Sequence, residues 1–64
     1  MKAVEINHAE YQRRVHTLPS SSLRYIIQDA REAIAANPGG PKDGYYTDEV
    51  LYCAAELRRR GDLT

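Results

Sequence analysis

Two proline-containing breaks divide this chain into segments that each have the length of a helix. Asn37–Pro41 contains two prolines and two glycines, and proline removes a backbone amide and disfavours helical geometry at the residue before it. Leu18–Pro19, followed by three serines, is a similar break. A chain of 64 residues has room for one small domain. Because it contains a single cysteine, this domain has no internal disulfide framework.

The segments between the breaks have the periodicity of amphipathic helices. We predict an arm at 1–7, helices at 8–17, 21–36 and 47–60, and a loop at 37–46. The expected N-caps are Asn7, one of the three serines, and Thr47, and Gly61 is the expected C-cap of the last helix. The predicted fold class is all-α: a small helical domain formed by a two-helix antiparallel hairpin plus an N-terminal helix.

Both predicted hairpin helices have an apolar face. Ile26, Ile27 and Ile34 are expected to pack against Tyr46, Val50, Cys53, Ala54 and Leu57. On the other side of the last helix, Leu51, Tyr52 and Ala55 form an apolar strip between Arg58 on one edge and Glu49 and Glu56 on the other. The N-terminal helix covers this strip, or a partner or a second copy does. Because so short a chain has a small core, homodimerisation is an expected aid to stability.

The candidate partner-binding residues are all predicted to lie at the surface of the domain. Tyr25 projects from the polar face of 21–36 beside Arg24, a composition typical of binding hot spots. The full set is Tyr25, Tyr45, Tyr46, Leu51, Tyr52, Ala55, Arg58 and Arg59.

No residue pattern indicates catalysis, a cofactor or a metal. His8, His16 and Cys53 are the only nitrogen or sulfur ligands, and a structural zinc normally needs four. Cys53 falls on the apolar face of its helix, where cysteine behaves as a small hydrophobic residue. We therefore expect no catalytic, cofactor-binding or metal-binding residues, and no enzyme activity.

The charge balance disfavours nucleic acid as a partner. Nine basic and nine acidic residues give a net charge of zero, so no overall field attracts a polyanion. Arg58, Arg59 and Arg60 are explained by the negative end of a helix dipole. No apolar run approaches a membrane span, and the N-terminus lacks the apolar core of a secretory signal, so we expect a cytoplasmic protein without membrane contact.

The segments SLRYIIQDAREAIAANP and GYYTDEVLYCAAELRRR resemble a group of short accessory proteins encoded by tailed bacteriophages. The resemblance covers roughly residues 22–60 and supplies no functional residue. It implies action inside a bacterial cell, where such proteins often bind and block a host protein.

The leading hypothesis is therefore a non-enzymatic protein-binding module, a phage-encoded modulator or inhibitor of a host bacterial protein that acts by steric occlusion. The contact surface would be the strip of Leu51, Tyr52 and Ala55 or the Tyr45–Tyr46 loop. The alternatives are a small helical nucleic-acid-binding regulator and a minor virion or assembly component.

Overall fold

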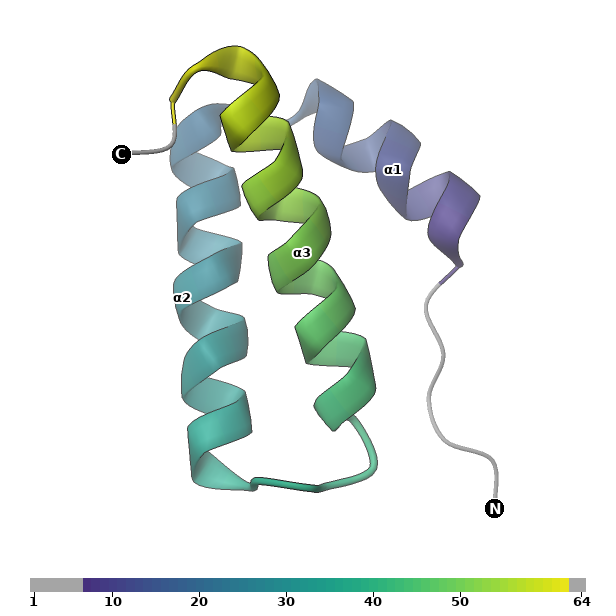
Figure 1. The fold of residues 1–64 in the computed structure, drawn as a ribbon, viewed down its shortest axis with the longest axis vertical. Coiled ribbons are helices and arrows are strands. Elements are labelled where there is room, and N and C mark those ends of the chain that lie inside the picture. The colour runs from purple at the N-terminus through teal and green to yellow at the C-terminus, as the bar shows by residue number, and fades with distance from the viewer. Residues whose placement is uncertain (1–6, 63–64) are drawn as a thin grey trace.

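The computed structural model describes residues 7–62, which form three helices and no strand. These are α1 (His8–Thr17), α2 (Ser20–Ala36) and α3 (Asp43–Arg60) (Figure 1). The predicted all-α class is confirmed. Of the predicted arm at 1–7, only Asn7 lies within the described residues.

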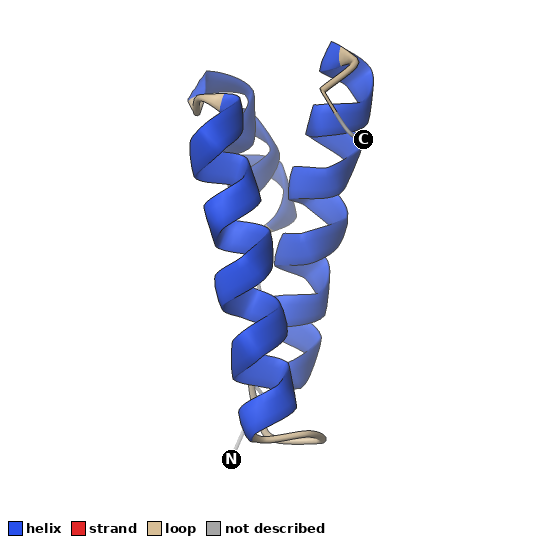
Figure 2. Ribbon diagram, turned by 90° about the vertical axis from the view of Figure 1, so that its left-hand side faces the viewer, coloured by secondary structure: helices blue, strands red, loops and turns tan. Residues whose placement is uncertain are grey.

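The longest helices, α2 and α3, lie side by side in two perpendicular views and are joined at one end by a loop at 37–42 (Figures 1 and 2). Their contact is the most extensive between any two helices of the described residues. The first helix packs against α3 and diverges from it toward its own N-terminus (Figure 1).

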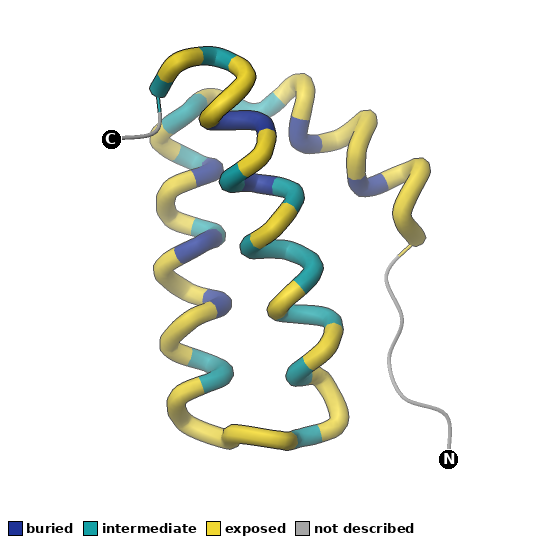
Figure 3. The backbone as a smooth tube through the Cα atoms, viewed as in Figure 1, coloured by how far each residue is buried: buried dark blue, intermediate teal, exposed yellow. Residues whose placement is uncertain are grey.

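The buried core lies where all three helices meet. It consists of Tyr11, Val15, Leu23, Ile27, Cys53 and Leu57. These residues come from α1, the first part of α2 and the second part of α3 (Figure 3). Ile26, Val50 and Ala54 are half-buried and pack against this cluster, whereas Ile34 is half-buried outside it.

Two predicted caps are confirmed. The Asn7 side chain accepts a hydrogen bond from the Glu10 amide at 3.1 Å, which satisfies one of the free donors at the start of α1. Gly61 has a φ of 76°, the left-handed geometry that ends α3 and that glycine adopts without a Cβ clash.

The predicted start of the third helix is wrong. α3 begins at Asp43, and Thr47 is an interior residue whose hydroxyl donates to the Asp43 carbonyl at 2.9 Å. The Asp43 carboxylate accepts from the Gly39 amide at 3.1 Å, which fixes the turn before the helix. Tyr45 and Tyr46 are therefore helical and half-buried, not loop residues, and Tyr45 packs against the core.

The predicted serine cap of the second helix is also wrong. Pro19 occupies the N-cap position, where no side-chain hydrogen bond is made. The Ser20 hydroxyl instead donates to the carboxylate of Asp62, just beyond α3, and Arg24 donates to the Asp62 carbonyl at 2.6 Å. The polar groups at the start of α2 therefore hold it to the end of α3.

Candidate functional site

The predicted apolar strip on α3 is divided by the position of α1. Tyr52 is half-buried, because α1 packs against its ring. The centroid of the Tyr52 ring lies 5.6 Å from the centroid of the His8 ring and 5.9 Å from that of the Tyr11 ring. A hydrogen bond also joins the Tyr52 hydroxyl to His8 Nδ1. Leu51, by contrast, is 61% exposed, and Ala55 is also exposed. The N-terminal helix thus covers one member of the strip and leaves two open.

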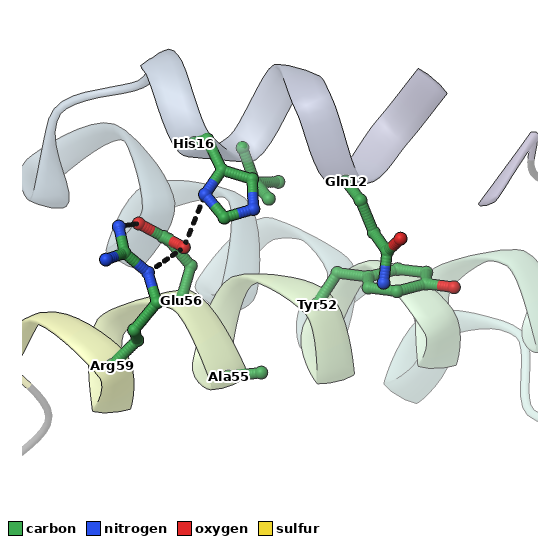
Figure 4. A pocket seen from close by; sticks show the side chains of 7 residues that line it. Gln12, His16, Tyr52, Ala55, Glu56 and Arg59 are labelled. Atoms are coloured by element: carbon green, nitrogen blue, oxygen red, sulfur yellow. Dashed lines mark hydrogen bonds and ion pairs between the residues drawn. The ribbon is translucent and has the colours of Figure 1, made fainter. Parts of the chain in front are cut away.

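An open cleft of ≈ 170 Å³ lies beside Ala55, between α1 and α3 (Figure 4). It is lined by Gln12, Val15 and His16 from α1 and by Tyr52, Ala55, Glu56 and Arg59 from α3. On each helix the lining positions recur at three- and four-residue spacing, so each helix contributes one face. Its lining combines apolar side chains, such as Val15 and Ala55, with polar and charged ones, such as Gln12, His16 and Arg59.

Glu56, expected on the charged edge of the strip, is buried, with 3% of its side chain exposed. Arg59 donates to it through Nε at 2.9 Å and through Nη2 at 2.5 Å. Arg60 donates through Nε at 2.7 Å, and His16 Nδ1 lies 3.2 Å away. Glu56 is buried because α1 lies over its side of α3, and the carboxylate is tolerated there because it is fully paired.

These donors determine the electrostatic state of Glu56. The hydrogen bond from Arg59, followed by that from Arg60, lowers the pKa of the carboxyl group to about 2 against the opposing effect of burial. The carboxylate in turn raises the pKa of Arg59. Glu56 is therefore ionised at neutral pH and forms the centre of an ion-pair cluster at one end of the cleft.

The arginines at the end of α3 have separate environments. Arg60 is mostly buried, with 19% of its side chain exposed, and Nη2 donates to the Val15 and His16 carbonyls at 3.2 and 3.3 Å. Arg59 pairs with Glu56 but keeps 61% of its side chain exposed. Arg58 is exposed. Arg59 and Arg60 thus share the single carboxylate of Glu56, and Arg60 is also mostly buried, which weakens the case for a phosphate-binding patch.

The tyrosine candidates do not gather at one place. Tyr25 is 70% exposed and lies across α2 from Leu23 and Ile27, which α2 buries. Tyr45 and Tyr46 contact each other in the first turns of α3, with ring centroids 5.8 Å apart. The structure therefore places Leu51, Ala55, Arg58 and Arg59 on one helix, and Tyr25 on another.

The buried polar groups serve the packing of α1 on α3. The Tyr11 hydroxyl donates to Glu49 at 2.7 Å, and burial together with this bond raises the pKa of Tyr11. Burial also raises the pKa of the Cys53 thiol, which is enclosed in the core. Residues 7–62 contain no group of three or more His, Cys, Asp or Glu side chains that could hold a metal ion.

Sequence reasoning missed the cleft and the cluster around Glu56. Gln12 and His16 line the cleft but have no distinctive pattern in the sequence. A signal for the cluster was present, because Arg59 and Arg60 follow Glu56 by three and four residues, the spacing at which helical side chains meet.

No family of proteins, no curated protein and no solved structure matches this chain. Among the described residues, no helix is long and apolar enough to cross a membrane.

Proposed function

We propose that this chain is a non-enzymatic protein-binding module that docks through the outer surface of α3. The observation that carries the proposal is Leu51, which is 61% exposed although it stands in the middle of a helix, one turn before Ala55, which lines the open cleft. A large apolar side chain near a cleft lined by apolar and polar groups resembles the core and rim of protein interfaces. Burial of the exposed part of Leu51 by a partner would contribute about 1–2 kcal/mol.

The scaffold suits this role. We infer that α2 and α3 act as an antiparallel hairpin that holds the outer surface of α3 rigid, with Glu56 and Arg60 fixing α1 beside it. A preorganised surface loses little conformational entropy on binding. A non-enzymatic role is supported by Cys53, because a buried thiol with a raised pKa is a poor nucleophile.

The partner we propose is a host bacterial protein, on the basis of the resemblance to short accessory proteins of tailed bacteriophages. The chain would act in the bacterial cytoplasm as a modulator or inhibitor that covers a functional surface of its target. Steric occlusion requires only a stable contact surface and no chemistry, which agrees with the small size of the chain.

The test is affinity capture from bacterial lysate with the tagged chain and with Leu51→Asp. We expect a specific protein to be captured by the unmodified chain and lost with Leu51→Asp, because a buried aspartate without a partner is costly. Ala35→Asp is the matched control, since Ala35 is an exposed residue on α2. Equal capture by all three proteins would contradict the proposal.

A second pair of variants locates the surface. Tyr25→Ala removes the exposed aromatic ring of α2, and Arg58→Ala removes a charge about two turns beyond Leu51 on the same face of α3. If α3 is the docking helix, Arg58→Ala weakens capture and Tyr25→Ala does not. The reverse result would transfer the docking surface to α2.

A further inference from the structure

Four residues form a single line along the outward side of α3: Asp48, Leu51, Ala55 and Arg58, which we call the outer stripe. Their spacing of three, four and three residues places them on one face of the helix. Leu51, Ala55 and Arg58 are exposed and Asp48 is half-buried. No ion pair within residues 7–62 involves Asp48 or Arg58, so both charges are available to a partner.

The outer stripe is complementary to the outer stripe of a second copy that runs in the opposite direction. It has an acidic residue at one end, a basic residue at the other, and a large and a small apolar residue between them. If a second copy packs with its α3 running in the opposite direction, Asp48 of each copy lies level with Arg58 of the other. Leu51 of each then lies level with Ala55 of the other, as the symmetry of a twofold contact requires. Parallel packing would instead bring like charges level with each other.

The cleft between α1 and α3 supplies a place for the exposed leucine. Ala55 lines the cleft together with Tyr52 and Arg59, and the volume is ≈ 170 Å³. A cavity of about 150 Å³ can hold a benzene molecule, so this cleft has room for a leucine side chain. Each copy has both the protruding Leu51 and the cleft, so one antiparallel contact fills two clefts.

We propose that a second copy of this chain docks antiparallel on the outer stripe, with Leu51 of each copy in the α1–α3 cleft of the other. The net charge of zero means that no overall repulsion opposes the pairing. Because the proposed contact uses one helix and the adjoining cleft of each copy, we expect an interface at the small end of the usual range and a dissociation constant on the order of micromolar. The inference rests on the proposed function in that both use Leu51, and a host partner therefore competes with the second copy.

Sedimentation equilibrium of the full chain tests the pairing over about 1–500 micromolar protein. We expect a reversible monomer–dimer transition for the unmodified chain. Leu51→Asp raises the dissociation constant at least about 100-fold, because two leucines leave the interface. Leu51→Gln gives a smaller increase, and Ala35→Asp on α2 gives none. A chain that remains monomeric over the whole range would overturn the inference.

Charge exchange tests the direction of packing. Asp48→Arg and Arg58→Asp should each raise the dissociation constant about 10-fold by placing like charges level across the interface. The double variant Asp48→Arg/Arg58→Asp should return it close to the original value, because each new arginine then meets a new aspartate. Circular dichroism confirms that every variant is helical before it is compared. A double variant as weak as the single ones would overturn the antiparallel arrangement.

The two proposals fail in different ways. If the chain is monomeric but captures a host protein through Leu51, the dimer proposal fails and the protein-binding proposal stands. If the chain dimerises through Leu51 but the unmodified chain and Leu51→Asp capture the same proteins, the proposal of a host partner fails and the dimer proposal stands.

Discussion

Arg60 near the end of α3 donates a hydrogen bond to the carbonyl oxygen of Val15 in the last turn of α1, at 3.2 Å. The Val15 carbonyl also accepts from the amide of Leu18, the residue after α1, at 3.3 Å, so the guanidinium is its second donor. Arg60 also donates to the carbonyl of His16, in the last turn of α1, at 3.3 Å. The same side chain pairs with Glu56 at 2.7 Å. Arg60 thus connects the short first helix to the rest of the domain through charge-assisted hydrogen bonds.

Arg60→Ala should lower the free energy of unfolding by about 1–3 kcal/mol, because it removes a charged donor from the buried Glu56 carboxylate, which then keeps only Arg59 and His16, and removes the link from α3 to the Val15 and His16 carbonyls of α1. Urea denaturation followed by circular dichroism measures the change. Arg31→Ala, an exposed arginine on α2, is the control and should change stability by less than about 0.5 kcal/mol. Equal effects of the two substitutions would contradict the role of Arg60.

Stability should depend on pH through Glu56. Its pKa is lowered from 4.5 to about 2 in the folded chain by Arg59 and Arg60. The unfolded chain therefore takes up the proton first as the pH falls, and the contribution of Glu56 is complete above about pH 4.5 and lost toward pH 2.

Thermal melts at several pH values between 7 and 2 measure this dependence. Glu56→Gln keeps the size of the side chain but removes its ionisation, so it should lower the melting temperature at pH 7 and flatten the decrease between pH 4.5 and 2. Parallel curves for the two proteins over that interval would show that Glu56 is not the group responsible.

Cys53 should be unreactive toward thiol reagents while the chain is folded. The residue is 0% exposed, and burial raises the pKa of its thiol, so little thiolate is accessible at pH 8. Modification with a chromogenic disulfide reagent should be slow in buffer and fast in concentrated urea. Rapid modification in buffer would mean that α1 frequently leaves its position over the core.

Asn7→Ala should lower the free energy of unfolding by about 0.5–2 kcal/mol, because its side chain caps the Glu10 amide at 3.1 Å. Ser21→Ala is a matched control, because Ser21 is one of the three serines among which the cap of the second helix was predicted. The N-cap of α2 is Pro19 without a side-chain bond, so the loss of the exposed Ser21 hydroxyl should have little effect. Chemical denaturation of both variants measures the difference.

Local sequence signals predicted most of the fold. Proline at 19 and 38 and the periodicity of the apolar residues gave helices 8–17 and 21–36, within one residue of α1 and α2. The start of α3 was not predictable in this way, because Gly44 and the two tyrosines have weak helix propensity. The bond from Gly39 to the Asp43 carboxylate and the packing of Tyr45 on the core stabilise that turn, and both depend on the folded chain.

The candidate site was predicted only in part, for a similar reason. A helical projection identified Leu51 and Ala55 as surplus apolar residues, and both are exposed. It could not place α1, whose position determines that Tyr52 is covered and that Glu56 is buried. The cleft is formed by residues some forty positions apart in sequence, and no local pattern reports such a contact.

Because the core joins the first part of α2 to the second part of α3, the far ends of these helices are held less firmly. Residues 31–36 and 43–49 include half-buried side chains but no buried one (Figure 3). Local opening there breaks fewer apolar contacts than opening around Leu23 or Leu57. Backbone amides beside the loop at 37–42 should therefore exchange with deuterium earliest, while those facing α1 retain their hydrogens longest.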